Sequence, residues 1–293
     1  MRPELRDLEL LVSLSRHKNF SLAASDCNIS QPAFSTRIRK MEERIKLPLV
    51  RRGNSFRGFT PEGDVVLKWA RKLLADAEGL RQEIYALKDR LDGKLTLGVI
   101  PTAMPFAARV SSKLRDQHPN LSIEIHSLST RQIGLRLNDF SLDAGIIYHE
   151  DAKTETTEIL YQERYVLIAP RSLTSRQGPS VTWSEAAQFP LCLLTPDMRN
   201  RQLIDAVFAQ VSVTPTVVME ASGFTAVLAQ VVGGNAATIA PVGLAETFLA
   251  LSSTTQFDLV EPVMTQTIGL SIKNQSPQPP ILLALRKAVK ASL

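Results

Sequence analysis

Basic and hydroxyl-bearing side chains gather between residues 31 and 60 of this 293-residue chain. This segment contains two acids, Glu42 and Glu43, and eight cations: Arg37, Arg39, Lys40, Arg44, Lys46, Arg51, Arg52 and Arg57. Cations at this density attract phosphate, and Ser, Thr, Arg and Lys are side chains that bond to phosphates or base edges. The pattern predicts nucleic-acid binding. From charge alone, a solvated basic helix face remains the alternative.

The positive charge of the chain is confined to its first third. Residues 1–92 hold 18 Lys or Arg against 13 Asp or Glu, whereas residues 93–293 hold 16 of each. The formal net charge of +5 therefore creates a field in the first part of the chain only. No run of 18 uncharged apolar residues exists, and no signal-peptide core is visible near residue 1. We expect a cytoplasmic protein without membrane contact.

Three short helices are needed to position these side chains. Apolar residues recur at helical spacing from Leu5 to Leu14, and Ser21 and Ser30 are expected to cap the next two helices. Pro32 is tolerated in the first turn of the third helix. That helix has an apolar stripe at Phe34, Ile38, Met41 and Ile45, and its opposite face holds Pro32, Ser35, Thr36, Arg39 and Lys40. This is the pattern of a helix-turn-helix whose last helix enters the major groove.

A hairpin is expected to follow the third helix. Residues 47–60 contain two glycines, an asparagine and a serine between short β-prone runs. Arg51, Arg52 and Arg57 of this hairpin would reach an adjacent backbone or minor groove, so the hairpin is interpreted as a wing.

These runs together resemble the DNA-binding domain of LysR-type transcriptional regulators. The resemblance is carried, in order, by residues 20–24 (FSLAA), 29–35 (ISQPAFS), 38–42 (IRKME), 49–52 (LVRR) and 60–63 (TPEG). It implies that Gln31, Pro32 and Ser35, with Arg52 of the wing, contact DNA. Thr36 and Arg51 depart from the family pattern, in which Arg and an acid are usual, and Arg37 follows directly. Cys27 replaces the usual Leu and is interpreted as a core residue.

A long helix is expected over residues 61–92, with Thr60 as its cap and Pro61 at its first position. Its apolar residues alternate at spacings of four and three, which predicts a dimeric coiled coil; packing against the chain's own domain is the alternative. The seam comprises Val66, Ala70, Leu73, Ala77, Leu80, Ile84, Leu87 and Leu91. The resemblance likewise implies dimers, which commonly assemble into tetramers. A symmetric dimer would bind an inverted-repeat site on double-stranded DNA.

Short apolar runs alternate with amphipathic helices after residue 92, which predicts an α/β fold with mostly parallel sheets. Expected strands are 95–100, 121–126, 144–148, 165–169, 191–194, 214–219, 237–240 and 268–272. Expected helices are 104–117, 130–138, 183–187, 199–211, 223–232, 241–247 and 278–291. The resemblance implies an effector domain of two subdomains, like periplasmic solute-binding proteins. Subdomain I would comprise about 93–163 and 269–293, and subdomain II about 164–268.

Ligands of such sheets bind beyond the carboxyl ends of the strands, where hydroxyls recur before the expected helices. Each hydroxyl is by itself more typical of a helix cap than of a ligand contact. By the resemblance, Thr102, Thr130, Thr195 and Ser222 line a cleft for a small effector, often a carboxylate or other anion, and His149 and Phe224 flank it. Closure of the cleft would alter promoter engagement.

Two other classes of protein are alternatives to the regulator hypothesis. No GxSxG, P-loop, GxGxxG or HExxH motif points to an enzyme, and the two cysteines, Cys27 and Cys192, form no metal or redox pair. We therefore expect neither an enzyme nor a bound cofactor or metal. A solute-binding protein is disfavoured by the helix-turn-helix, and a ligand-independent regulator stays open. Expected partners are DNA, the small effector, further copies of the chain and RNA polymerase.

Overall fold

Three helices pack around one apolar core in the first part of the computed structural model. They are α1 (Leu5–His17), α2 (Phe20–Asp26) and α3 (Gln31–Ile45). The predicted stripe of α3 is confirmed, since Phe34, Ile38 and Met41 are buried against Leu11 and Leu14 of α1. The structure describes residues 4–51, 53, 56–87, 91–149, 157–174, 178–248, 253–272 and 275–293.

Of the two helix caps predicted in this region, the cap of α3 is confirmed and the cap of α2 is wrong. Ser30 caps α3 as expected, because its hydroxyl accepts the amide of Ala33 at 3.4 Å. The prediction that Ser21 caps α2 is wrong. Asn19 takes that role, and its Oδ1 accepts the amides of Ser21 at 2.8 Å and Leu22 at 3.1 Å. Asn is as good a cap as Ser, so the helix begins one residue earlier, at Phe20.

The fourth helix, α4 (Pro61–Ala86), begins as predicted at Thr60, whose hydroxyl accepts the amide of Gly63 at 2.9 Å. Its start lies tightly against residue 49: a Cβ on Gly63 would stand 2.0 Å from the carbonyl oxygen of Leu49. The described helix ends at Ala86 rather than near Asp92. Residues 88–90 lie outside the described part of the chain.

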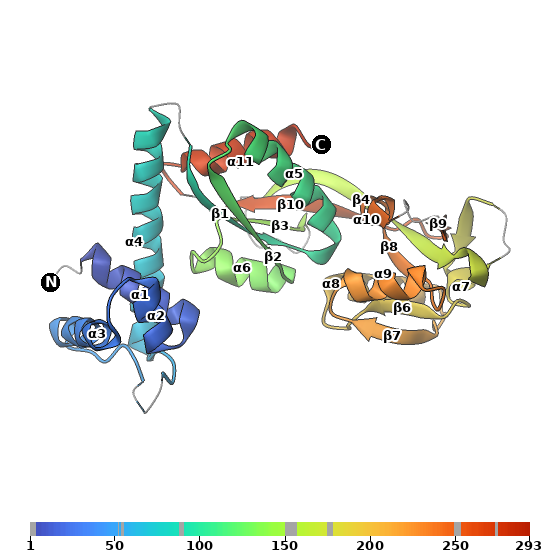
Figure 1. Cartoon of the computed structure of the whole chain (residues 1–293). Helices are drawn as coiled ribbons and strands as arrows, with labels where there is room; N and C mark the ends of the chain where they lie inside the picture. Colours follow the sequence, from blue (N-terminus) through green and yellow to red (C-terminus); the bar gives the residue numbers. More distant parts are fainter. Residues whose placement is uncertain are drawn as a thin grey trace. The chain divides into compact units, whose positions relative to one another are not determined.

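Contacts divide the chain into two compact units. One comprises Met1–Leu91 with the short segments Asn138–Ser141 and Pro277–Pro280, and the other comprises the remaining residues. The second unit is α/β, as predicted, and its helices and strands alternate along the chain (Figure 1).

The second unit begins with β1 (Gly93–Val99), a short 3-10 turn (Pro101–Ala103), α5 (Met104–Gln117), β2 (Leu121–Ser127), α6 (Thr130–Asn138) and β3 (Ala144–Tyr148). The three strands are parallel, with β1 between β2 and β3. Helices α5 and α6 lie on opposite sides of these strands (Figure 1). This part forms the first subdomain.

The second subdomain follows a long strand, β4 (Thr157–Pro170). Its elements are β5 (Ser180–Thr182), α7 (Trp183–Ala186), β6 (Leu191–Leu194), α8 (Arg199–Gln210), β7 (Val217–Ala221), α9 (Phe224–Val232), β8 (Thr238–Pro241), α10 (Val242–Phe248) and β9 (Thr254–Val260). The chain returns through β10 (Thr265–Ile272) and ends with α11 (Pro280–Lys290). Strands β6 and β7 form a separate parallel pair.

Strand β4 joins the two subdomains. Its first half, up to Arg164, pairs antiparallel with β10, whereas Tyr165 and the residues after it pair antiparallel with β8 and β9. The larger sheet runs in the order β2-β1-β3-β10-β4-β9-β5, with β8 paired to β4. The expectation of mostly parallel sheets is therefore wrong for the strands that connect the subdomains. The strand predicted over 165–169 also starts earlier, at Thr157, and β5 and β9 were not predicted.

Among the described residues, no helix is long and apolar enough to cross a bilayer.

Candidate functional site

The face of α3 opposite its apolar stripe is open to solvent. Gln31, Pro32, Thr36, Arg39 and Lys40 are exposed, and Ser35 is half-buried. The Gln31 amide nitrogen donates to the Ser35 hydroxyl at 3.0 Å, so two of the predicted DNA contacts are already oriented by each other. The face therefore presents amide, hydroxyl and cationic groups in one row along the helix.

Arg37 lies differently from the other predicted DNA contacts. Its Nε is 3.3 Å from Oδ1 of Asp7, and its Nη2 is 3.4 Å from a carboxylate oxygen of Glu4, both at the start of α1. Arg44 pairs with the other oxygen of Asp7. Asp7 is only 2% exposed, so these ion pairs tie α3 to α1. A contact between Arg37 and DNA stays a prediction, and the structure gives its guanidinium group a local role.

The predicted wing is present as a narrow antiparallel turn. Val50 bridges Phe59, and the amide of Arg51 donates to the carbonyl of Gly58 at 2.9 Å. The side chains of Arg51 and Arg57 are exposed, while Arg52 lies outside the described residues.

One carboxylate attaches the wing to α3. Oε1 of Glu42 accepts the amides of Leu49 at 2.9 Å and Val50 at 3.1 Å, so the wing begins at a fixed place beside the helix.

The seam predicted on α4 divides into two parts. Ala70 is fully buried and Val66 packs against the core of the first unit, as the own-domain alternative proposed. Ala77 is half-buried. Farther along, Leu73, Leu80, Ile84 and Leu87 are exposed, with 61% of Leu80 and 87% of Leu87 accessible. Large apolar side chains in one exposed row need a partner surface.

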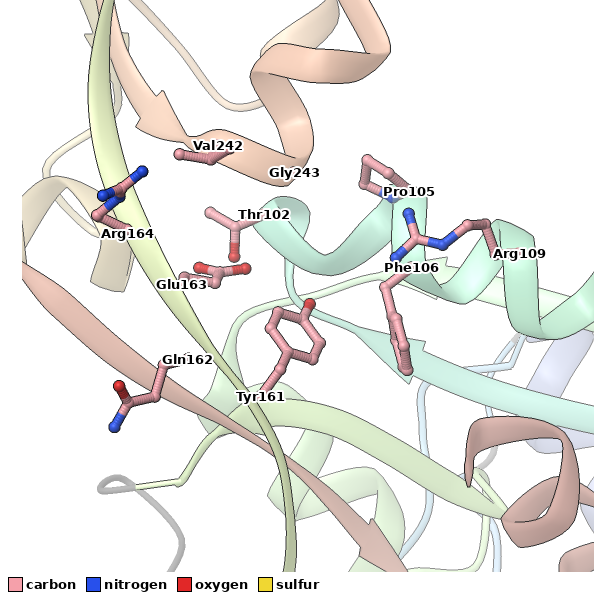
Figure 2. A pocket seen from close by; sticks show the side chains of 10 residues that line it. All are labelled: Thr102, Pro105, Phe106, Arg109, Tyr161, Gln162, Glu163, Arg164, Val242 and Gly243. Atoms are coloured by element: carbon pink, nitrogen blue, oxygen red, sulfur yellow. The ribbon is translucent and has the colours of Figure 1, made fainter. Parts of the chain in front are cut away.

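A cavity of about 310 Å³ lies in the second unit, where β4 leaves the first subdomain (Figure 2). The 3-10 turn and α5 form one wall, β4 a second and the start of α10 a third. The lining residues are Thr102, Pro105, Phe106, Arg109, Tyr161, Gln162, Glu163, Arg164, Val242 and Gly243.

Glu163 is the buried acid of this cavity. It is 5% exposed, its Oε2 has no hydrogen-bond partner, and its carboxyl group points toward Thr102 (Figure 2). Burial raises the pKa of Glu163 to about 8, because desolvation disfavours the charged form, and the neighbouring Thr102 hydroxyl opposes part of that shift. At neutral pH the side chain is therefore mainly a neutral acid that can donate a hydrogen bond.

A row of buried hydroxyls continues from Thr102. Its Oγ1 lies 3.3 Å from the Tyr148 hydroxyl, which lies 3.3 Å from the Tyr165 hydroxyl. Asn200 of α8 donates to Tyr165 at 3.2 Å, while its own Oδ1 has no partner. Burial raises the pKa of Tyr148 and of Tyr165, so both phenols stay neutral. The row links the 3-10 turn and β3 to the helix α8 of the second subdomain.

The part of the cavity between α5 and Tyr161 of β4 is aromatic and cationic. The rings of Phe106 and Tyr161 lie 5.0 Å apart, and the guanidinium carbon of Arg109 lies 5.5 Å from the centroid of Phe106. Burial raises the pKa of Tyr161, the charge of Glu163 adds to the shift, and Arg109 opposes it. Arg164 is exposed and lies 3.7 Å from Asp258. Arg109 is thus the cation best placed to meet a ligand.

Of the effector residues predicted from the sequence, Thr102 lines this cavity. Thr130 and His149 are half-buried at other strand ends, and each has a buried atom, Oγ1 and Nδ1 respectively, without a hydrogen-bond partner. Thr195 is half-buried after β6 and Ser222 is exposed after β7. The side chain of Phe224 packs in the core of the second subdomain. Their roles in ligand binding stay predictions.

The acid and the tyrosines of the cavity were not predicted from the sequence. Tyr161, Glu163 and Tyr165 alternate along β4, so the three face the same side of the strand. That period-two pattern was available, but the strand was expected to begin only at Tyr165. An acid between two tyrosines on one face of a strand would have been the signal for the site.

Neither metal nor thiol chemistry is indicated. The described residues contain no group of three His, Cys, Asp or Glu side chains that could hold a metal ion. Both cysteines are buried, and burial raises the pKa of Cys192.

Comparison with family models covers nearly the whole chain. Residues 5–64 match the bacterial regulatory helix-turn-helix protein, lysR family, and residues 88–293 match the LysR substrate binding domain.

Comparison with curated proteins finds relatives of partial coverage. The hydrogen peroxide-inducible genes activator of Pectobacterium carotovorum is 32% identical over 144 residues, which are 49% of this chain and 48% of that protein. The corresponding activator of Haemophilus influenzae is 33% identical over 189 residues, 64% of this chain and 60% of that protein. The matched stretch thus spans about half the length of the first of these relatives.

Solved structures share the fold over almost the full length. A full-length OxyR variant from Pseudomonas aeruginosa has a TM-score of 0.78 at 22% identity, with 99% of this chain and 95% of that chain covered. CbnR in complex with its target DNA has a TM-score of 0.70 at 20% identity, with 99% and 100% covered.

Proposed function

Because the chain belongs to the LysR family of bacterial regulatory helix-turn-helix proteins, we propose that it binds operator DNA as a dimer or tetramer and responds to a small anionic effector. The observation that carries the DNA-binding part is the exposed face of α3, which presents Gln31, Thr36, Arg39 and Lys40 beside the arginines of the wing. A helix of this kind fits the major groove, and basic side chains beside it meet the phosphates.

The exposed row on α4 supports the oligomeric part of the proposal. Leu80, Ile84 and Leu87 lie beyond the part of α4 that packs into the first unit. Pairing of two such helices would bury them and would present two copies of α3 to an inverted-repeat site. CbnR has been solved on its target DNA, and we extend DNA binding to this chain on the strength of its own α3.

The cavity beside β4 supports the effector part. It is concave, partly apolar, and has a few polar groups that converge, as small-molecule sites usually have. It lies where β4 passes from one subdomain to the other, so a ligand there contacts elements of both. Such a ligand changes DNA binding only if it favours one arrangement of the subdomains over another.

Thiol oxidation is not part of this proposal, although several relatives are named for induction by hydrogen peroxide. The chain has two cysteines, and they lie in different compact units. Both are buried, and a reactive thiol needs access and a lowered pKa.

A gel-shift assay with the DNA upstream of the gene tests the proposal. We expect a specific complex whose affinity falls steeply as salt is added, because binding releases counterions from phosphates. Random DNA of the same length is the control. Absence of binding, or binding that salt does not weaken, would refute the regulator function.

A further inference from the structure

The burial of the Glu163 carboxyl group in the cavity is not explained by a helix cap, an ion pair or a packing requirement. A buried carboxyl group with an unpartnered oxygen is costly, so its presence calls for a group that completes its hydrogen bonding. On the basis of the function proposed above, we infer that Glu163 is the specificity-determining residue of the cavity: it selects an anionic ligand by donating a hydrogen bond to it, while Arg109 compensates the negative charge.

The surroundings of Glu163 favour a donor over a charged acceptor. On β4, Tyr161 and Tyr165 flank it on the same side, and on β3 and the 3-10 turn Tyr148 and Thr102 face it. These groups are neutral hydroxyls. From β10, the register partner is the uncharged Gln266.

Arg109 and Arg164 are the cations among the lining residues of this cavity, and Arg164 lies 3.7 Å from Asp258. From α5, Arg109 lies beside Phe106 and Tyr161, and from α8 the nearest polar group of the row is the amide of Asn200. At the start of α10 the cavity is lined by Val242 and Gly243, which carry no charge. No cation in this described set pairs with the carboxyl group, so its neutral form is the stable one near pH 7.

A neutral acid and a carboxylate ligand are complementary. The acid offers one O–H donor, and a hydrogen bond to an anionic oxygen is stronger than one between neutral groups. Arg109 can stay over the Phe106 ring while its N–H groups face the anion. The aromatic pair Phe106 and Tyr161 supplies an apolar wall for the body of the ligand. A cationic ligand would be repelled by Arg109, and its pairing with Glu163 would require that the carboxyl group ionise.

The inference predicts a specific pH dependence of binding. If the ligand needs the protonated acid, its affinity is constant at low pH and falls as Glu163 ionises. With the pKa of Glu163 at about 8, the dissociation constant should rise about tenfold between about pH 7 and about pH 9. A ligand that pairs with the ionised acid would show the opposite sign.

The test uses the full-length protein and two shape-matched series of probes. One series is hexanoate, hexanamide and hexylamine, and the other is phenylacetate, phenylacetamide and phenethylamine. Binding is measured by calorimetry across the pH range. We expect the carboxylate of at least one series to bind more tightly than the corresponding amide and amine. Its affinity should fall about tenfold between about pH 7 and about pH 9.

Two variants separate the roles of the acid and the cation. Glu163→Gln keeps a hydrogen-bond donor that cannot ionise. Binding of the carboxylate probe should therefore persist and lose its pH dependence. Arg109→Gln should weaken the binding of the carboxylate probe at every pH but leave the pH dependence of that binding unchanged. Tighter binding at high pH, preference for the amines, or no binding of either acid at millimolar concentration would overturn the inference. Specific DNA binding in the gel shift would survive any of these outcomes, so failure of this inference and failure of the proposed DNA binding can be told apart.

Discussion

At the scale of single residues, two positions are decided by what lies within a few ångströms of them. Gly63 has no space for a side chain because the Leu49 carbonyl closes over it. Glu163 is held in a site that disfavours its charge. The contact at Gly63 is a packing constraint that fixes where the wing joins α4. At Glu163, burial in the cavity changes the pKa of an ordinary side chain.

We expect Gly63→Ala to destabilise the first unit by about 3 kcal/mol, since a backbone carbonyl 2.0 Å from the new Cβ cannot move away as a side chain could. Chemical denaturation measures the loss. Gly134→Ala in α6 is the matched control, because nothing lies within 4 Å of a Cβ there. The control should leave stability unchanged or raise it by up to about 1 kcal/mol. Equal effects at the two glycines would contradict the crowding at Gly63.

Glu163 should also make the stability of the protein depend on pH. Its pKa is raised in the folded state above the ordinary value of 4.5, so the stabilisation is fully present below pH 4.5 and is lost as pH rises through about 8. We expect the midpoint of thermal unfolding to fall over this window by roughly 10 °C more in the wild type than in Glu163→Gln. Parallel pH profiles would show that the carboxyl group is not buried as described.

At the scale of elements, α3 and α4 each divide their surface between internal packing and an outward face. One side of α3 is fixed to α1 by apolar contacts and by the pairs of Arg37 and Arg44 with Asp7. Its other side is exposed. Helix α4 packs with its first turns and exposes the later part of its seam. This division indicates which substitutions change binding and which change folding.

Two arginines two residues apart on α3 should therefore behave differently. Arg39→Ala should lower DNA affinity by roughly 1 kcal/mol without changing the free energy of unfolding, because the side chain is exposed. Arg37→Ala should lower the free energy of unfolding by about 1.5 kcal/mol, because it removes a charged partner of the buried Asp7. Titration with operator DNA and urea denaturation measure the two quantities. If Arg37→Ala left stability unchanged, the tie between α1 and α3 would be unimportant.

The exposed seam of α4 gives an oligomer prediction. Leu80→Asp or Ile84→Asp should dissociate the dimer, since a carboxylate cannot be buried in an apolar seam without a partner. Both side chains are exposed in the single chain, so each subunit should keep its fold, which circular dichroism can verify. Glu83→Gln, at an exposed position outside the seam, is the control. An unchanged mass by light scattering for both aspartate variants would exclude this helix as the dimer contact.

At the scale of the whole molecule, the two units differ in charge as well as in fold. Residues 1–92 carry the entire excess of positive charge, and residues 93–293 are balanced. The phosphate-binding field therefore belongs to the unit that contains α3, and the balanced unit contains the cavity. This separation allows the two functions to be tested independently.

The salt dependence of DNA binding should report only on the first unit. Loss of a cation that meets phosphate, as in Arg57→Ala, should reduce the slope of log affinity against log salt by about 1. Arg115→Ala and Lys287→Ala remove exposed cations of the second unit and should leave the slope unchanged. A reduced slope in these controls would mean that the second unit also binds the phosphate backbone.

Local patterns in the sequence sufficed for much of the first unit. The stripe of α3, its Ser30 cap, the Thr60 start of α4 and the wing depend on neighbours within a few residues, so periodicity and capping chemistry predicted them. The Ser21 cap failed because Asn19 competes for the same amides at short range. The α/β class of the second unit was also determined by alternating runs along the chain.

Only the tertiary structure decided what the polar residues of the second unit do. Thr102 and Glu163 are 61 residues apart in the chain and meet because β4 runs between the subdomains in antiparallel pairing with β10. The sequence places an acid in a strand, but its neutrality at pH 7 arises from burial among Tyr148, Tyr161 and Tyr165, which is a property of three-dimensional packing. Desolvation depends on what surrounds a group in space, and no local pattern along the chain records it.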